Sequence, residues 1–204
     1  MNAINRTLTM VALSAATLAA TPAKEAPSAW TMDVAHTQIE FSVKHFFTPV
    51  RGQFTEFDAV VDFDPENPSE ASVSLKISVA SVDTHNDKRD AHLQSADFFD
   101  AEAYPYITFE STEVKAVGHT DFIIVGDLTI RDVTRQVELP LTLLGVQALE
   151  GEMSEAFGGL TQIASFQGGF TIDRRDFGVG NGSWAATAVV GGEVTINLSI
   201  ETNR

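Results

Sequence analysis

The chain has 204 residues, no cysteine and a formal net charge of −15. A surface this acidic repels nucleic acid and anionic membranes, so we expect no nucleic-acid partner. Hydrophobic residues make up 44% of the chain and include 14 phenylalanines, which is too apolar a composition for a disordered acidic chain. The length suits a single all-β domain, and the lack of cysteine excludes disulfides and cysteine-based zinc sites.

The first 23 residues are predicted to be a secretory signal peptide. Arg6 is followed by a run of small apolar residues at positions 7–20, and cleavage is expected between Ala19 and Ala23. The run is too short and too rich in alanine and threonine to span a membrane, and no later segment could do so. We therefore expect a periplasmic or secreted protein in which residues 24–204 form one barrel domain. A disordered or weakly amphipathic N-terminus is the alternative.

Eight segments alternate apolar and polar residues with the period of two that β-strands show. They follow a lead-in at residues 24–35 and are joined by turn-rich links, without the spacing of βαβ units, so we expect an antiparallel sheet. Phe54 precedes Phe57 by three residues, an odd step that predicts a bulge or bend between them. The predicted strands are "TQIEFSVKH", "FDAVVDF", "SVSLKISVA", "YITFESTEVKAV", "DFIIVGDLTI", "TRQVELPLTLLG", "ASFQGGFTIDR" and "EVTINLSIE".

Strands with one apolar face predict a single sheet curled on itself or two sheets packed face to face. An eight-stranded antiparallel barrel can either fill its interior with side chains or hold one ligand. Ala59, Gly126 and Gly168 are small residues on inward faces. They leave room for a neighbouring ring or for a ligand, and the strand pattern alone leaves both options open.

Around residues 85–103 the alternation stops, and a charged segment ends in two phenylalanines. We predict a helix over residues 85–94 with a capping box formed by Thr84 and Asp87, and with Leu93 facing inward. This helical insert would cover one end of the barrel.

Arg89 on this helix has two candidate roles. It could be aimed at the polar head group of a ligand at a portal, or it could pair with Asp90, Asp97 or Asp176 as a structural contact. Of the two, the structural role is favoured.

Catalytic and metal-binding motifs do not occur in the sequence. The five histidines show no HExxH-type spacing, so we expect no metal and no cofactor. The Asp-Phe-Gly at residues 176–178 lacks the glycine-rich loop and catalytic loop of a kinase. The strand pattern places one titrating side chain, His45, on an inward face as a candidate. We predict no enzymatic activity.

Six segments spread over the chain resemble the YceI-like family, lipocalin-like polyisoprenoid-binding proteins that are mostly secreted by bacteria. The block at residues 84–109 carries the most specific part of the resemblance. Asp132 and Ser165 stand where the family usually has glycine. The matching segments are "WTMDVAHTQIEFSVKHF", "VRGQFTEFDAVVDFD", "SVDTHNDKRDAHLQSADFFDAEAYPYITFEST", "GDLTIRDVTRQVELPL", "FTIDRRDFGVG" and "EVTINLSIE".

The resemblance implies an extended eight-stranded antiparallel lipocalin-like barrel around an apolar tunnel. The implied ligand is a long amphiphilic lipid, such as an isoprenoid quinone, a polyprenyl chain or a fatty-acid derivative. His45 and Arg89 are the candidates for contact with its polar head group. Inward-facing residues that would line the tunnel or its covered end are Ile39, Phe41, Val43, Leu75, Ile77, Phe98, Phe99, Phe109, Leu128, Phe170, Ile196 and Leu198.

The predicted function is therefore that of a periplasmic binding or carrier protein. One alternative is a stress-response or interaction module with a filled barrel. Another is a lipid isomerase or hydrolase that uses His45. A homodimer, and a membrane-bound protein that hands over the lipid or quinone, are left open as partners.

Overall fold

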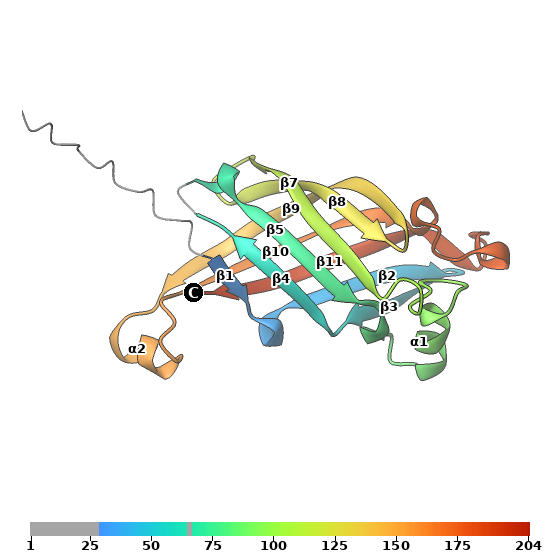
Figure 1. Cartoon of the computed structure of the whole chain (residues 1–204), viewed down its shortest axis with the longest axis horizontal. Coiled ribbons are helices and arrows are strands. Elements are labelled where there is room, and N and C mark those ends of the chain that lie inside the picture. Colours follow the sequence, from blue (N-terminus) through green and yellow to red (C-terminus); the bar gives the residue numbers. More distant parts are fainter. Residues whose placement is uncertain (1–28, 65–66) are drawn as a thin grey trace, which may run out of the picture.

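The computed structural model describes residues 29–64 and 67–204, and the predicted signal peptide lies outside them. The described chain forms a closed antiparallel barrel, with helix α1 (Asp87–Gln94) near one end and helix α2 (Gly151–Ala156) at the other (Figure 1). Its strands are β1 (Ala29–Met32), β2 (Gln38–His45), β3 (Thr48–Phe54), β4 (Phe57–Asp62), β5 (Ser72–Ser78), β6 (Val82–Asp83), β7 (Tyr106–Ala116), β8 (Asp121–Ile130), β9 (Val133–Ala148), β10 (Gln162–Asp173) and β11 (Val190–Asn203).

The described strands occupy eight positions around the barrel because three positions are each built from two pieces. β1 and β2 share the position next to β11. β3 and β4 share the next position, where β4 pairs with β1 and β3 pairs with β2. β5 and the short β6 share the third, where β5 pairs with β4 and β6 pairs with β3. The pairing of β1 with β11, which places Thr31 opposite Asn203, closes the ring. The predicted eight-stranded antiparallel barrel is confirmed.

The breaks in the three divided strands lie at neighbouring points of the sheet. The first is a 3-10 turn, η1 (Val34–His36), the second lies at residues 55–56, and the third is η3 (Val79–Ser81). Ser81 joins the last two, since its carbonyl accepts from Thr55 N at 3.2 Å. The break explains the odd step between Phe54 and Phe57, because it lets both rings be buried.

Beyond these breaks the described part of the barrel has a seam. β6 pairs with β3, whereas β7 begins at Tyr106, opposite Ser78 of β5. The insert that contains α1 connects β6 to β7 and lies at this seam. It therefore sits where strand pairing around the ring is interrupted.

Helix α1 begins two residues later than predicted, and its cap differs. Asn86, not Thr84, is the N-cap, and its side-chain oxygen accepts from Arg89 N at 3.1 Å. The Thr84 hydroxyl instead contacts the Asp90 carboxylate and the Arg89 side chain. The predicted capping box of Thr84 and Asp87 is wrong because asparagine, also a preferred cap residue, lies closer to the first helical turn.

Two phenylalanines fix the insert to the barrel. Phe98 is buried, with its ring 5.7 Å from that of Trp184, and the Phe99 ring meets Phe54 edge-on at 6.0 Å. Arg131, in the turn after β8, donates from Nη1 to the Phe98 carbonyl at 2.7 Å. The insert thus contacts β3, the β8–β9 turn and the loop before β11, as expected of a cover over one end.

A second group of apolar residues packs at the other end of the barrel, near β1. The Trp30 indole donates to the carbonyl of Phe63 at 2.8 Å, and the Phe63 ring meets Phe166 edge-on. Arg204 lies over the Trp30 ring at 4.7 Å. These contacts join β1, β4, β10 and the end of β11.

Four strands and helices were not among the predicted elements. β1 lies within the predicted lead-in at residues 24–35, which is therefore wrong for its last part. β3, the two-residue β6 and α2 were also missed. β1 has four residues, and β3 contains both proline and glycine, so neither displays a clean alternating pattern.

Candidate ligand-binding cavity

An apolar cavity lies inside the barrel. The centre of a water molecule can occupy a volume of about 220 Å³ inside it. By the same measure, a cavity that holds a single water needs only about 10–15 Å³. Of its 33 lining residues, 29 are apolar, and the others are Thr37, Glu40, Arg174 and Thr202. Water has few hydrogen-bond partners in such a space, so the cavity suits an apolar occupant.

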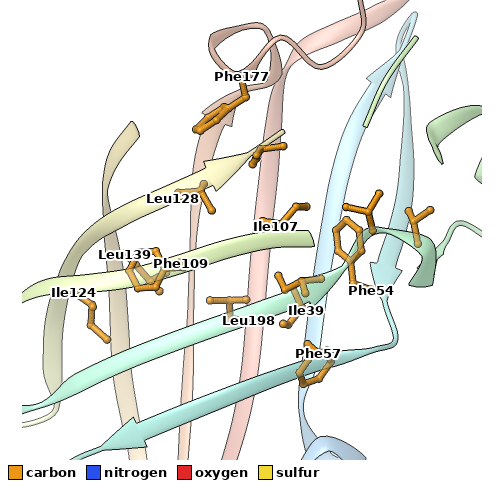
Figure 2. Packing of buried hydrophobic residues seen from close by; sticks show 14 of the residues in the cluster. Ile39, Phe54, Phe57, Ile107, Phe109, Ile124, Leu128, Leu139, Phe177 and Leu198 are labelled. Atoms are coloured by element: carbon orange, nitrogen blue, oxygen red, sulfur yellow. The ribbon is translucent and has the colours of Figure 1, made fainter. Parts of the chain in front are cut away.

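All twelve residues predicted for the apolar tunnel line this cavity. The inward side chains come from both sides of the barrel (Figure 2). They are Ile39, Phe41 and Val43 on β2; Leu75 and Ile77 on β5; Phe98 and Phe99 in the insert; and Phe109, Leu128, Phe170, Ile196 and Leu198 on β7, β8, β10 and β11.

Strand register makes the lining continuous across neighbouring strands. Ile196 lies opposite Phe41 on one side and Phe170 on the other. Phe109 lies likewise between Leu75 and Leu128. Since alternate side chains of a strand point to the same face, each such row contributes an apolar band to the interior.

The inward glycines accommodate neighbouring side chains rather than open space. A Cβ on Gly126 would lie 2.4 Å from the Phe109 ring, and one on Gly168 would lie 2.1 Å from the backbone oxygen of Pro140 and 2.6 Å from a Leu141 methyl group. The absent side chains therefore let neighbouring residues of the wall pack closely.

Neither residue predicted for head-group contact is part of the cavity lining. His45 is exposed where β2 ends, and its ring packs against Phe46 at 4.8 Å. Arg89 donates from Nε and Nη2 to the hydroxyl and carbonyl of Thr84, both at 2.7 Å. The favoured structural role of Arg89 agrees with these contacts, but its partner is Thr84 rather than one of the three predicted aspartates.

Arg174 is a buried cation at the cavity that the sequence reasoning did not find. Its side chain is 4% exposed, and burial lowers the pKa of its guanidinium. Backbone carbonyls accept its N–H groups, which is the arrangement needed to bury a charge. The accepting carbonyls are those of Gly191 at 2.8 Å, Val179 at 2.7 Å, Gly180 at 3.5 Å, Trp184 at 2.7 Å and Val190 at 3.0 Å.

The alternation of β10 was the signal that could have located Arg174. Phe170 and Ile172 precede it at steps of two and also line the cavity, so Arg174 continues their inward face into the turn η4 (Arg174–Phe177). It holds the loop that joins η4 to β11 against this end of the barrel.

A group of polar side chains lies where β1 is followed by η1. His36 Nδ1 is 2.9 Å from Asp33 Oδ2 and 3.7 Å from Glu201 Oε1. The hydrogen bond between Asp33 and His36 lowers the pKa of Asp33 and raises the pKa of His36. These three residues could offer metal ligands, but their direct contacts account for the grouping as an ion pair. The expectation that the chain binds no metal stays a prediction.

A closed antiparallel barrel around an apolar cavity is a lipocalin-like architecture. The model of the YceI-like domain matches residues 30–202. The chain belongs to the YceI-like family. Within residues 29–64 and 67–204, no helix has the length and apolar character needed to cross a membrane.

Similar proteins occur in several bacteria. A UPF0312 protein of Pseudomonas paraeruginosa is 36% identical over 199 residues, covering 97% of both chains. The crystal structure of BcnA from Burkholderia cenocepacia has a TM-score of 0.72 and 30% identity, and the match covers 83% of this chain and 98% of that one. A polyisoprenoid-binding domain from Saccharophagus degradans has a TM-score of 0.60 and 14% identity, covering 85% and 97%, and is similar in fold.

Proposed function

We propose that the protein binds a long-chain amphiphilic lipid, an isoprenoid quinone or polyprenyl chain, in the barrel cavity and carries it through the periplasm without a catalytic step. The observation that carries this proposal is the apolar lining, in which 29 of 33 residues are apolar. Burial of each CH₂ group contributes about 0.8 kcal/mol. Ten buried carbons would therefore contribute on the order of 8 kcal/mol before the cost of ordering the chain.

Two further observations support a lipid ligand. A barrel of related fold is a polyisoprenoid-binding domain, which gives support at the level of the fold. The cavity also speaks against the alternative of a filled barrel that acts only through its surface. The enzymatic alternative required His45 inside the barrel, and that side chain is exposed at the end of β2.

The first test is mass analysis of the protein purified from its own host. Native mass spectrometry should reveal a bound apolar mass, and denaturing lipid extraction should identify it. Repeated preparations without such a mass, together with no binding of an added polyprenyl compound or quinone, would overturn the proposal.

A matched pair of variants on one strand locates the binding site. Ile196 lines the cavity, whereas its neighbour Asn197 is exposed on the other face of β11. Ile196→Gln places an amide in the apolar cavity, so we expect affinity for the added lipid to fall about tenfold, or about 1.4 kcal/mol. Asn197→Gln should leave it unchanged. Equal affinities in the two variants would exclude the cavity as the site.

The carrier role and the location require separate measurements. Protein added between donor and acceptor vesicles should accelerate lipid transfer in proportion to its concentration. Cell fractionation of the full chain should recover the shortened product in the periplasm. Binding without transfer would indicate storage or sequestration in place of transport.

A further inference from the structure

The turn between β2 and β3 exposes two adjacent aromatic side chains. Phe46 is 55% exposed and Phe47 is 93% exposed. They form a two-residue turn between the paired residues His45 and Thr48, and Phe46 has a positive φ of 52°. Glycine, asparagine and aspartate are favoured in such turns, and a bulky residue with positive φ is uncommon. Most of the surface of both rings is exposed, and the described ring contact of Phe46 is with its neighbour His45.

The charge around this turn differs from that of the chain as a whole. Residues 41–53 contain Lys44 and Arg51 but no acidic residue, and residues 177–192 contain no charged residue. The two segments meet at the turn, where Phe46 N donates to the carbonyl of Val189 at 2.7 Å. The two segments that meet at the exposed rings therefore carry two cations and no acidic side chain, in a protein with a net charge of −15.

Two acidic side chains lie on the strands that adjoin this surface. Asp173 at the end of β10 is bound by Arg175 through a hydrogen bond of 2.9 Å, and this contact lowers the pKa of Asp173 to about 2. Glu193 lies on β11 and shares a surface hollow with Lys44 and Arg175. Basic side chains thus stand beside both carboxylates.

The exposed turn adjoins the cavity. Val43 lines the cavity three residues before Phe46, and Val190 lines it directly after the exposed Val189. The hairpin lies toward the end of the barrel that carries the insert, opposite α2 (Figure 1). A surface that contacts this turn would therefore face the Arg174 end of the cavity.

We propose that the β2–β3 turn docks this end of the barrel onto a membrane that contains anionic lipids. Aromatic side chains favour the membrane–water interface, and lysine and arginine are attracted to anionic head groups. The acidic remainder of the surface is repelled, which orients the turn toward the lipid and keeps the contact reversible. The purpose of this docking, access of a membrane lipid to the cavity, rests on the proposed function, but the contact itself does not.

Co-sedimentation with vesicles tests this docking. The vesicles contain equal parts of phosphatidylglycerol and phosphatidylethanolamine. The test variant is Phe46→Gly with Phe47→Ser, since glycine adopts positive φ without strain and preserves the turn. The control variant is Met153→Ser with Phe157→Ser in and after α2, which removes two side chains that are 52% and 56% exposed at the opposite end. Three glutamates and no cation lie within residues 150–160.

We expect the unaltered protein and the α2 control to bind the vesicles, and the turn variant to bind at least tenfold more weakly. An unaltered protein that stays in the supernatant, a turn variant that binds fully or a control that loses as much would each overturn the proposal. The proposal would also be overturned if light scattering showed that the unaltered protein is a dimer and the turn variant is not, because the rings would then contact a second copy of the chain. Bound lipid should be retained by the turn variant. Loss of vesicle binding with lipid retained is thus distinguished from a failure of the proposed lipid-binding function.

Discussion

Replacement of Arg174 by methionine should loosen one end of the barrel. The substitution keeps an apolar stem of similar length but removes every donor to the carbonyls that the guanidinium holds together. These carbonyls belong to Val179, Gly180, Trp184, Val190 and Gly191.

The magnitude follows from the fate of those carbonyls. Each one left buried without a donor would cost about 1–3 kcal/mol, and five such costs would rival the total stability of a domain, about 5–15 kcal/mol. The loop must therefore relax and admit water, and the variant also avoids burying a charge. We expect a net loss of about 3 kcal/mol, the scale on which breaking a buried charged cluster destabilises a protein.

Urea unfolding measures the loss, and hydrogen exchange followed by mass spectrometry locates it. Exchange should rise most in residues 178–191. Arg175→Met is the matched control, because the Arg175 side chain is exposed and its described hydrogen bonds are to Asp173, and surface ion pairs contribute little. A loss below about 1 kcal/mol for Arg174→Met, or exchange that rises evenly around the barrel, would refute the reasoning.

Two further substitutions test the wall and the rim of the barrel. Gly126→Ala should destabilise the fold by about 1–3 kcal/mol because its Cβ would collide with the Phe109 ring. Gly145→Ala is the control and should not destabilise the fold, because no atom lies within 4 Å of the added Cβ. Thermal unfolding of both variants distinguishes crowding at Gly126 from a general intolerance of glycine replacement. His36→Gln should lower stability more at about pH 5 than at about pH 8. The pKa of His36 is raised by its hydrogen bond to Asp33, so its contribution is complete below its unfolded pKa and is lost as pH rises through the folded pKa. Unfolding midpoints that differ equally at both pH values would contradict this sign.

The identity of the lining residues was predictable because a barrel strand has only two faces. Once alternation assigned Ile39, Phe41 and Val43 to the inner face, closure of the barrel left them no other environment. The same alternation predicted that His45 points inward, and that prediction is wrong. β2 continues to the end of a hairpin, where a side chain of inward parity meets solvent.

The missed features have local physical causes. β3 does not read as a strand because it contains Pro49 and Gly52. A Cβ at Gly52 would lie 2.5 Å from the Phe41 ring, so glycine here marks close approach across a sheet rather than a turn. Arg174 was overlooked because a cation on an inward face can be explained only when the carbonyls that bind it are in place. These carbonyls come from the segment after η4 and from the start of β11, which the sequence does not show to be close to Arg174.

Closure of the ring by β1 and β11 also determines when the chain can fold. Met32 pairs with Thr202 across almost the whole described sequence, and all-β proteins with such distant contacts fold in milliseconds to seconds. Made from its N-terminus, the chain presents the apolar side chains of β2 long before β11 exists to cover them. Aggregation and proteolysis therefore threaten this protein most during synthesis, and factors that hold the nascent chain would affect its yield more than its final stability.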